Sequence, residues 1–227
     1  MKTLRVIGIL WLRQLKRYVR SKPRMIGSLG QPILFLVAMG FGLGPVFQAA
    51  GQGNYLTFIA PGIIGMSILF TGVFSGIEVI WDRQFGFLKE TLVAPVSRET
   101  IMIGRTLGGA TVATIQGVIV FLITLVAGFR PESWTVLPIA FGFMALISLL
   151  FTAFGTAIAC KLQDMQAFPL IMNFLVMPMF FLSGALFPLE NLPGAMHIVT
   201  RINPLSYGID GLRAAFGTAH IFPMAMS

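Results

Sequence analysis

The stretch from Asp82 to Arg105 reads DRQFGFLKETLVAPVSRETIMIGR and separates two long apolar runs. Charges of both signs are mixed within it. Phe85, Leu88 and Leu92 are spaced at i, i+3 and i+7, which predicts a short helix with one apolar stripe. Pro95 ends that helix, because proline lacks an N–H and disfavours helical backbone in the residue before it. We therefore expect a short amphipathic helix between two long apolar segments.

Ser97 stands where it can cap the helix that follows. Its hydroxyl can accept a hydrogen bond from a free N–H of the first turn, and Glu99 brings a negative charge to the positive end of the helix dipole. Segment 82–100 is then a loop between two helices. Two interpretations of this loop stay open: an element that receives a push from a soluble partner, or an interfacial loop without a partner.

The composition indicates an integral membrane protein. Of 227 residues, 56% are hydrophobic and only 11% are charged, whereas soluble domains carry about 25% charged residues. The expected fold class is all-α, a polytopic helical membrane protein, because a helix satisfies its own backbone hydrogen bonds in lipid. The single cysteine, Cys160, excludes an internal disulfide, and no His/Cys spacing suggests a metal site.

Residues 1–24 hold half of the 16 basic residues and no acid. Apolar residues from Leu4 to Val19 fall near helical spacing, which predicts an interfacial helix on the cytoplasmic leaflet with Trp11 at headgroup depth. The alternative is a disordered basic leader. The charge pattern indicates anionic lipid rather than nucleic acid as a partner.

Five apolar segments approach or exceed the roughly 20 residues that a bilayer core requires. They lie at about 25–47, 55–81, 101–128, 134–160 and 167–186. Three glycine pairs at i, i+4 predict close helix contacts, and these pairs are Gly40 and Gly44, Gly72 and Gly76, and Gly104 and Gly108.

The basic residues predict the orientation. With the N-terminus inside, only Arg130, Arg201 and Arg213 of the 16 lie outside. The positive-inside rule therefore predicts a cytoplasmic N-terminus and a cytoplasmic segment 82–100.

Glu78 is the one acid written inside an apolar run. An ionisable residue within a span is a functional candidate. Glu78 also lies within one turn of Trp81 and Asp82, close to the end of the span. We favour the plainer interpretation, in which its carboxylate reaches the membrane interface.

The tail, 187–227, is broken by prolines and carries two short apolar stretches, 194–202 and 208–216. Neither is long enough to cross a bilayer. We expect short helices that dip into or lie on the outer face. Such backbone needs cover from protein or water, which favours a second subunit nearby.

Several kinds of chemistry have no motif here. No Gly-Lys-Ser/Thr phosphate-binding loop, no Gly-x-Ser-x-Gly elbow and no central charge pair for ion coupling occur in the sequence. We expect a protein that is not an enzyme and has no cofactor of its own. A secondary transporter that uses Glu78 is the weakest alternative.

The chain resembles the membrane subunit of bacterial type-2 ABC exporters, a class that includes drug-resistance and polysaccharide-export permeases. The resemblance covers nearly the whole chain and rests on the basic N-terminal helix and on four short motifs. The motifs are Tyr55-x-x-Phe58-x-x-Pro61-Gly62, Phe87-Leu88-Lys89-Glu90-Thr91-Leu92-Val93-Ala94-Pro95, Leu182-Ser183-Gly184 with Phe187-Pro188, and Asn203-Pro204 with Tyr207.

The resemblance implies a coupling helix around 85–94 that sits in a groove of an ABC ATPase subunit. The residues implied in this coupling are Phe85, Phe87, Leu88, Glu90, Leu92 and Pro95. It implies that the outer motif Asn203, Pro204 and Tyr207 helps to shape the exit of the pathway. It further implies two permease copies, as a homodimer or heterodimer, with two ATPase subunits that bind ATP and Mg²⁺, in the bacterial cytoplasmic (inner) membrane.

The family has a sixth span after the outer helices, and no apolar run of that length follows Arg213 here. We expect either a truncated sequence or a five-span variant, which bears on dimerisation and transport. By analogy with the drug-export branch, the expected cargo is drug or lipid-like. A polysaccharide-export permease and a non-transporting membrane scaffold are the alternatives.

Overall fold

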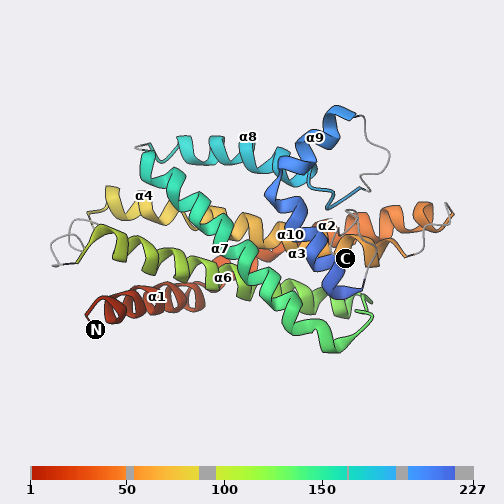
Figure 1. Cartoon of the computed structure of the whole chain (residues 1–227), viewed down its shortest axis with the longest axis horizontal. Coiled ribbons are helices and arrows are strands. Elements are labelled where there is room, and N and C mark those ends of the chain that lie inside the picture. Colours follow the sequence, from red (N-terminus) through yellow and green to blue (C-terminus); the bar gives the residue numbers. More distant parts are fainter. Residues whose placement is uncertain (1, 50–53, 87–95, 163, 188–193, 218–227) are drawn as a thin grey trace, which may run out of the picture.

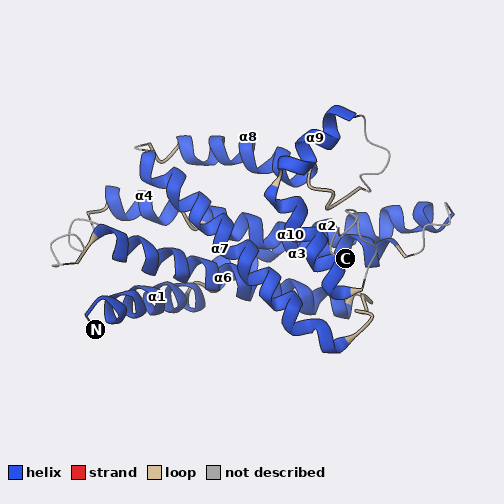
Figure 2. Ribbon diagram, viewed as in Figure 1, coloured by secondary structure: helices blue, strands red, loops and turns tan. Residues whose placement is uncertain are grey.

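The computed structural model describes residues 2–49, 54–86, 96–162, 164–187 and 194–217, which form a bundle of helices (Figures 1 and 2). No strand occurs within these ranges. Four helical segments are long and apolar enough to cross a membrane: Lys22–Phe47, Tyr55–Gln84, Arg98–Val126 and Trp134–Lys161. The predicted fold class, an all-α polytopic membrane protein, is confirmed.

The predicted N-terminal helix corresponds to α1, Lys2–Arg20. The next helix, α2, covers Lys22–Ala49, so the helix of the first span starts before the predicted residue 25 and includes Lys22 and Arg24. Only Ser21 separates the two helices. Pro23 is tolerated in the first turn of α2, where its missing N–H has no helical acceptor to lose.

The second predicted span, 55–81, corresponds to two consecutive helices. α3, Tyr55–Phe74, starts at Asn54, whose Oδ1 accepts a hydrogen bond from the N–H of Leu56 at 3.0 Å. α4, Ile77–Gln84, follows after a short interruption. Gly76 at this interruption lies directly against the backbone of Gly155, so a Cβ there would collide with main-chain atoms. The close approach explains why both positions are glycine.

α6, Arg98–Val126, begins where Ser97 predicts, and the Ser97 hydroxyl accepts a hydrogen bond from the N–H of Thr100 at 3.3 Å. After a turn, the 3₁₀ helix η1, Trp134–Val136, leads into α7, Leu137–Lys161. Gly72 and Gly76 face α7, and Gly104 and Gly108 face α1. The close contacts expected from these two glycine pairs are therefore present, whereas Gly44 of the third pair has open space beside it.

The fifth predicted span, 167–186, corresponds to a helix that is shorter than the four long segments. α8, Ala167–Phe181, has 15 residues, which give about 22 Å of helix against a hydrocarbon core of about 30 Å. The chain then turns through Gly184, whose φ of +76° is strained for any residue with a side chain.

The last two helices differ in position. α9, Gly194–Ile202, lies beside the end of α8, whereas α10, Pro204–Phe216, lies against α3 and α7 (Figure 1). The sequence predicts that these short helices dip into or lie on the outer face. Most residues of α10 are buried within the bundle, as a helix that dips in under protein cover requires. Phe216 stacks on Phe121 of α6, with ring centroids 5.3 Å apart.

The centre of the bundle is α3. It contacts α2, α6, α7 and α10, and nearly all of its residues from Ile59 to Leu69 have no exposed surface. The outer helix α2, in contrast, is mostly exposed, since only 11% of its most apolar stretch is buried within the bundle. A hydrophobic helix without protein cover is stable in lipid, where apolar surface carries no penalty.

Candidate functional site at the α1 end of the bundle

One end of the bundle brings together α1, the end of α4 and the start of α6, and we call it the α1 end (left in Figure 1). The segment predicted to contact an ATPase connects α4 and α6 at this end. Of its predicted residues, Phe85 is described; Phe87, Leu88, Glu90, Leu92 and Pro95 lie outside the described residues. Phe85 does not open a new helix, because its N–H donates to Trp81 O at 2.9 Å and closes α4. Its side chain is exposed.

Hydrogen bonds fix the residues just before the predicted contact segment. Arg83 donates from Nη1 to Leu162 O at 2.8 Å and from Nη2 to Cys160 O at 3.1 Å. Both acceptors belong to the end of α7, whose last carbonyls lack partners within the helix. The end of α4 is therefore tied to the end of α7.

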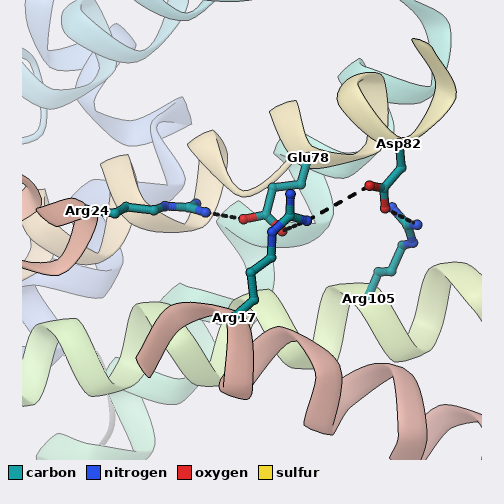
Figure 3. Close-up of polar contacts among 5 residues, drawn as sticks. All are labelled: Arg17, Arg24, Glu78, Asp82 and Arg105. Atoms are coloured by element: carbon teal, nitrogen blue, oxygen red, sulfur yellow. Dashed lines mark hydrogen bonds and ion pairs between the residues drawn. The ribbon is translucent and has the colours of Figure 1, made fainter. Parts of the chain in front are cut away.

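Glu78 of α4 lies in an ion cluster rather than at a free surface (Figure 3). Its carboxylate is 4% exposed, accepts a hydrogen bond from Arg24 of α2 and lies 3.5 Å from Nη1 of Arg17 of α1. The expectation that Glu78 reaches the membrane interface stays a prediction, and its partners Arg17 and Arg24 are 39% and 37% exposed. The two arginines compensate for the loss of hydration.

Asp82 lies one turn after Glu78 on the same face of α4 and extends the cluster (Figure 3). Its carboxylate accepts a hydrogen bond from Arg105 of α6, and its Oδ1 lies 3.9 Å from Arg17 Nη1. Asp82 and Arg105 are 4% and 5% exposed. The cluster of Arg17, Arg24, Glu78, Asp82 and Arg105 thus joins four helices, α1, α2, α4 and α6, and its three cations exceed its two carboxylates.

The contact between α1 and α6 is close along its length. A Cβ at Gly104 would lie 3.0 Å from Leu10 Cβ, and Trp11 donates from Nε1 to Thr111 Oγ1 at 2.9 Å. The Tyr18 hydroxyl bonds to Oε1 of the buried Gln116. Burial raises the pKa of Tyr18, against an opposing effect of Arg24, so the hydroxyl keeps its proton and can donate it to this bond.

The outer motif from the sequence lies at the joint between α9 and α10. Asn203 caps α10 by accepting the N–H of Leu205 at 3.0 Å, and its amide donates to Met179 O of α8 at 2.6 Å. Pro204 is the first residue of α10, and the exposed Tyr207 donates its hydroxyl to Arg201 O at 2.7 Å. The motif therefore links α8, α9 and α10.

The charged groups at the α1 end form contacts between helices. Within the described ranges, no group of three or more His, Cys, Asp or Glu residues is arranged to hold a metal ion. Each carboxylate of the cluster is engaged by arginine, which leaves no pair of free acids for proton exchange.

Residues 5–216 match the family described as ABC-2 type transporter. The chain belongs to that family. It is similar to the putative transport permease ycf38 of Cyanophora paradoxa, with 30% identity over 192 residues that cover 83% of this chain and 66% of that protein. The ycf38 permease of Pyropia yezoensis is 31% identical over 209 residues, 88% of this chain and 70% of the relative. Nodulation protein J of Rhizobium meliloti (strain 1021) is 28% identical over 191 residues, which cover 83% of this chain and 72% of that protein.

As an ABC-2 type permease, the protein is a multi-pass membrane protein of a family that normally works with an ATPase subunit. Its permease relatives are transporters rather than enzymes. The chain itself has no nucleotide-binding motif.

Two features of this permease were not predicted. The first is the pairing of Glu78 and Asp82 with three arginines. The sequence did contain an indication of it, because the two acids are spaced at i, i+4 and Arg105 lies about two turns into the next span. The second is the burial of Arg213, a residue that the topology places on the outer side of the membrane. It is fully buried, donates from Nη2 to Gly184 O at 2.8 Å and lies 4.2 Å from the ring centroid of Phe58. A lone arginine in a short apolar helix indicated a buried role.

Proposed function

We propose that this ABC-2 type permease is the membrane-spanning subunit of an ATP-driven exporter, and that segment 82–100 contacts a separate ATPase subunit. One observation carries the proposal: the helices on both sides of this segment are held by a buried ion pair, Asp82 with Arg105. Because this ion pair joins the two flanking helices, a force on the segment moves α4 and α6 together. An interfacial loop without a partner needs no ion pair between its flanking helices.

The same cluster supports a route for the motion. Arg17 of α1 and Arg24 of α2 both engage Glu78, so a shift of α4 displaces the first two helices as well. α4 continues into α3 at the centre of the bundle. The motion that closes the ATPase pair, which binds ATP and Mg²⁺, therefore reaches the first, second and third spans.

We infer a drug or lipid-like cargo, with a polysaccharide as the alternative. An apolar groove of about 430 Å³ lies between α7, α8 and the α9–α10 joint, and Asn203 is its one strongly polar lining residue. The adjacent face of α8 exposes Phe174 to 84% and Leu170 to 62%. Apolar exposure of this kind suits lipid, an amphipathic cargo or a second permease copy.

We further propose that the complex has two permease copies and two ATPase subunits, and that its N-terminus and segment 82–100 face the cytoplasm of a bacterium. The basic face of α1 supports this orientation.

The test is purification from native membranes in mild detergent, followed by mass spectrometry and ATP hydrolysis assays. We expect an ATPase carrying a phosphate-binding loop in about equal amount. In the assembled complex, Phe87→Asp should abolish stimulated hydrolysis and leave membrane insertion intact, whereas Trp134→Asp, an exposed aromatic residue in η1, should preserve it. Absence of an ATPase, or unchanged hydrolysis in Phe87→Asp, would refute the proposal and favour a membrane scaffold.

A further inference from the structure

A groove of about 920 Å³ lies beside α1, next to the corner between α1 and α2, and Asp82 of α4 is its one acidic lining residue. Four cations line it: Arg13, Lys16, Arg17 and Arg20. Two apolar side chains, Ile9 and Leu12, are 58% and 43% exposed and line it as well. A strongly positive groove with apolar walls is unusual for a surface that meets only water.

The positive charge of the groove is not balanced by the protein. Arg17 engages Glu78 and Asp82, but Arg13, Lys16 and Arg20 form no ion pair with any residue in the described ranges. A smaller cavity next to the groove shares Arg13, Arg17 and Asp82 with it and also contains Arg105. Nε and Nη1 of the buried Arg105 have no hydrogen-bond partner in the described structure. Asp82 already lies between Arg105 and the groove, so it is the cations of the groove itself, Arg13, Lys16 and Arg20, that favour a further anion.

The exposed apolar residues of α1 indicate the kind of molecule to which the anionic group belongs. Leu4, Leu12 and Val19 are exposed along one side of the outward face of α1, and Arg13, Lys16 and Arg20 lie on the other side. A helix with this division lies in a membrane interface, with its apolar side toward acyl chains and its cations at headgroup depth. The groove adjoins the start of the first span, Lys22–Phe47, which enters the same membrane.

We propose that this groove is a binding site for an anionic phospholipid. The phosphate is held by Arg13, Lys16 and Arg20, and an acyl chain lies against Ile9 and Leu12. An acidic protein segment would satisfy the cations but would leave the apolar wall unused. The proposal concerns the permease alone and does not depend on an ATPase partner.

The site gives the lipid a structural role. A bound phosphate neutralises the excess charge beside Arg17, whose guanidinium also holds the Glu78 and Asp82 carboxylates. The bound lipid therefore stabilises α1 against α6 and holds the corner at Ser21 at the membrane surface.

The test uses the purified full chain in a neutral detergent and native mass spectrometry with defined lipids. Phosphatidylglycerol, which is anionic, is compared with zwitterionic phosphatidylcholine of the same acyl chains. The variant Arg13→Gln/Lys16→Gln/Arg20→Gln removes the groove cations. Its matched control, Arg5→Gln/Arg98→Gln/Lys161→Gln, removes three exposed cations outside the groove. Lys16→Gln alone is the milder variant if the triple change prevents folding.

The wild type and the control should retain phosphatidylglycerol in preference to phosphatidylcholine. The groove variant should bind phosphatidylglycerol at least about tenfold more weakly, because each cation near an anionic surface contributes measurably to the attraction. Equal retention of the two lipids by the wild type, or equal losses in the groove variant and its control, would overturn the proposal. Displacement of the lipid by millimolar inorganic phosphate would assign the site to a free anion instead and would also overturn it.

Discussion

Replacing Asp82 by leucine would leave Arg105 buried without a carboxylate partner. The guanidinium is 5% exposed, its only hydrogen bond in the described structure goes to Asp82, and its Nε and Nη1 are already without partners. In the converse variant, Arg105→Met, Asp82 keeps one cation nearby, because its Oδ1 lies 3.9 Å from Arg17 Nη1. The two single changes therefore differ in how well the remaining charge is compensated.

The expected magnitudes follow from this difference. Removal of one member of a buried ion pair costs about 3–5 kcal/mol of folding free energy. We expect Asp82→Leu to cost about 5 kcal/mol, because no carboxylate replaces the lost one beside Arg105. Arg105→Met should cost about 3 kcal/mol, because Arg17 remains close to Asp82. The double variant removes both charges, and its cost should fall to within about 1–2 kcal/mol of the wild type.

The assay is the free energy of unfolding in dodecyl maltoside micelles titrated with sodium dodecyl sulfate, followed by circular dichroism. Arg98→Met, which removes an exposed cation from the same helix, is the control and should change the free energy by less than about 0.5 kcal/mol. Additive costs in the double variant, or single variants as stable as the control, would show that the pair does not hold α4 to α6.

Three further changes test the packing. Tyr18→Phe should cost about 1–3 kcal/mol in the same titration, because the buried Gln116 Oε1 loses its donor; a cost no larger than that of an exposed Tyr207→Phe would refute this. Gly155→Val should lower the melting temperature sharply, since its side chain meets the backbone of α3; a stable protein would show that α3 and α7 are not in close contact. Asn203→Ala should cost about 1–2 kcal/mol through loss of the α10 cap. Asn203→Ser loses the same amide bond to Met179 O but keeps a capping oxygen, so equal losses in the two variants would argue against capping.

Local chemistry in the sequence was sufficient for much of the fold. The start of α6 follows from the Ser97 hydroxyl, and the four long spans follow from runs of apolar residues whose length matches a bilayer. The amphipathic spacing of residues 2–20 gives α1. These features depend on neighbours within one or two helical turns, and such neighbours are adjacent in the sequence as well as in space.

Other features depended on partners that are distant in the chain. The interruption between α3 and α4 needs the backbone of Gly155, and α10 is covered because α3 and α7 enclose it. The topology places Arg213 on the outer side of the membrane but does not predict its burial. The burial depends on the folded bundle, where the Gly184 carbonyl oxygen accepts a hydrogen bond from the guanidinium.

The sequence by itself determined that this is a helical membrane protein, roughly where its spans lie and which family it resembles, because hydrophobic length and charge distribution decide membrane insertion. Only the tertiary structure decided that Arg17, Arg24 and Arg105 meet Glu78 and Asp82. It also decided that Arg13, Lys16 and Arg20, which have no ion pair with any described residue, gather in a groove beside them. Charges separated by many residues along the chain interact only after α1, α2, α4 and α6 have packed, and the free energy of each pairing depends on the burial that this packing creates.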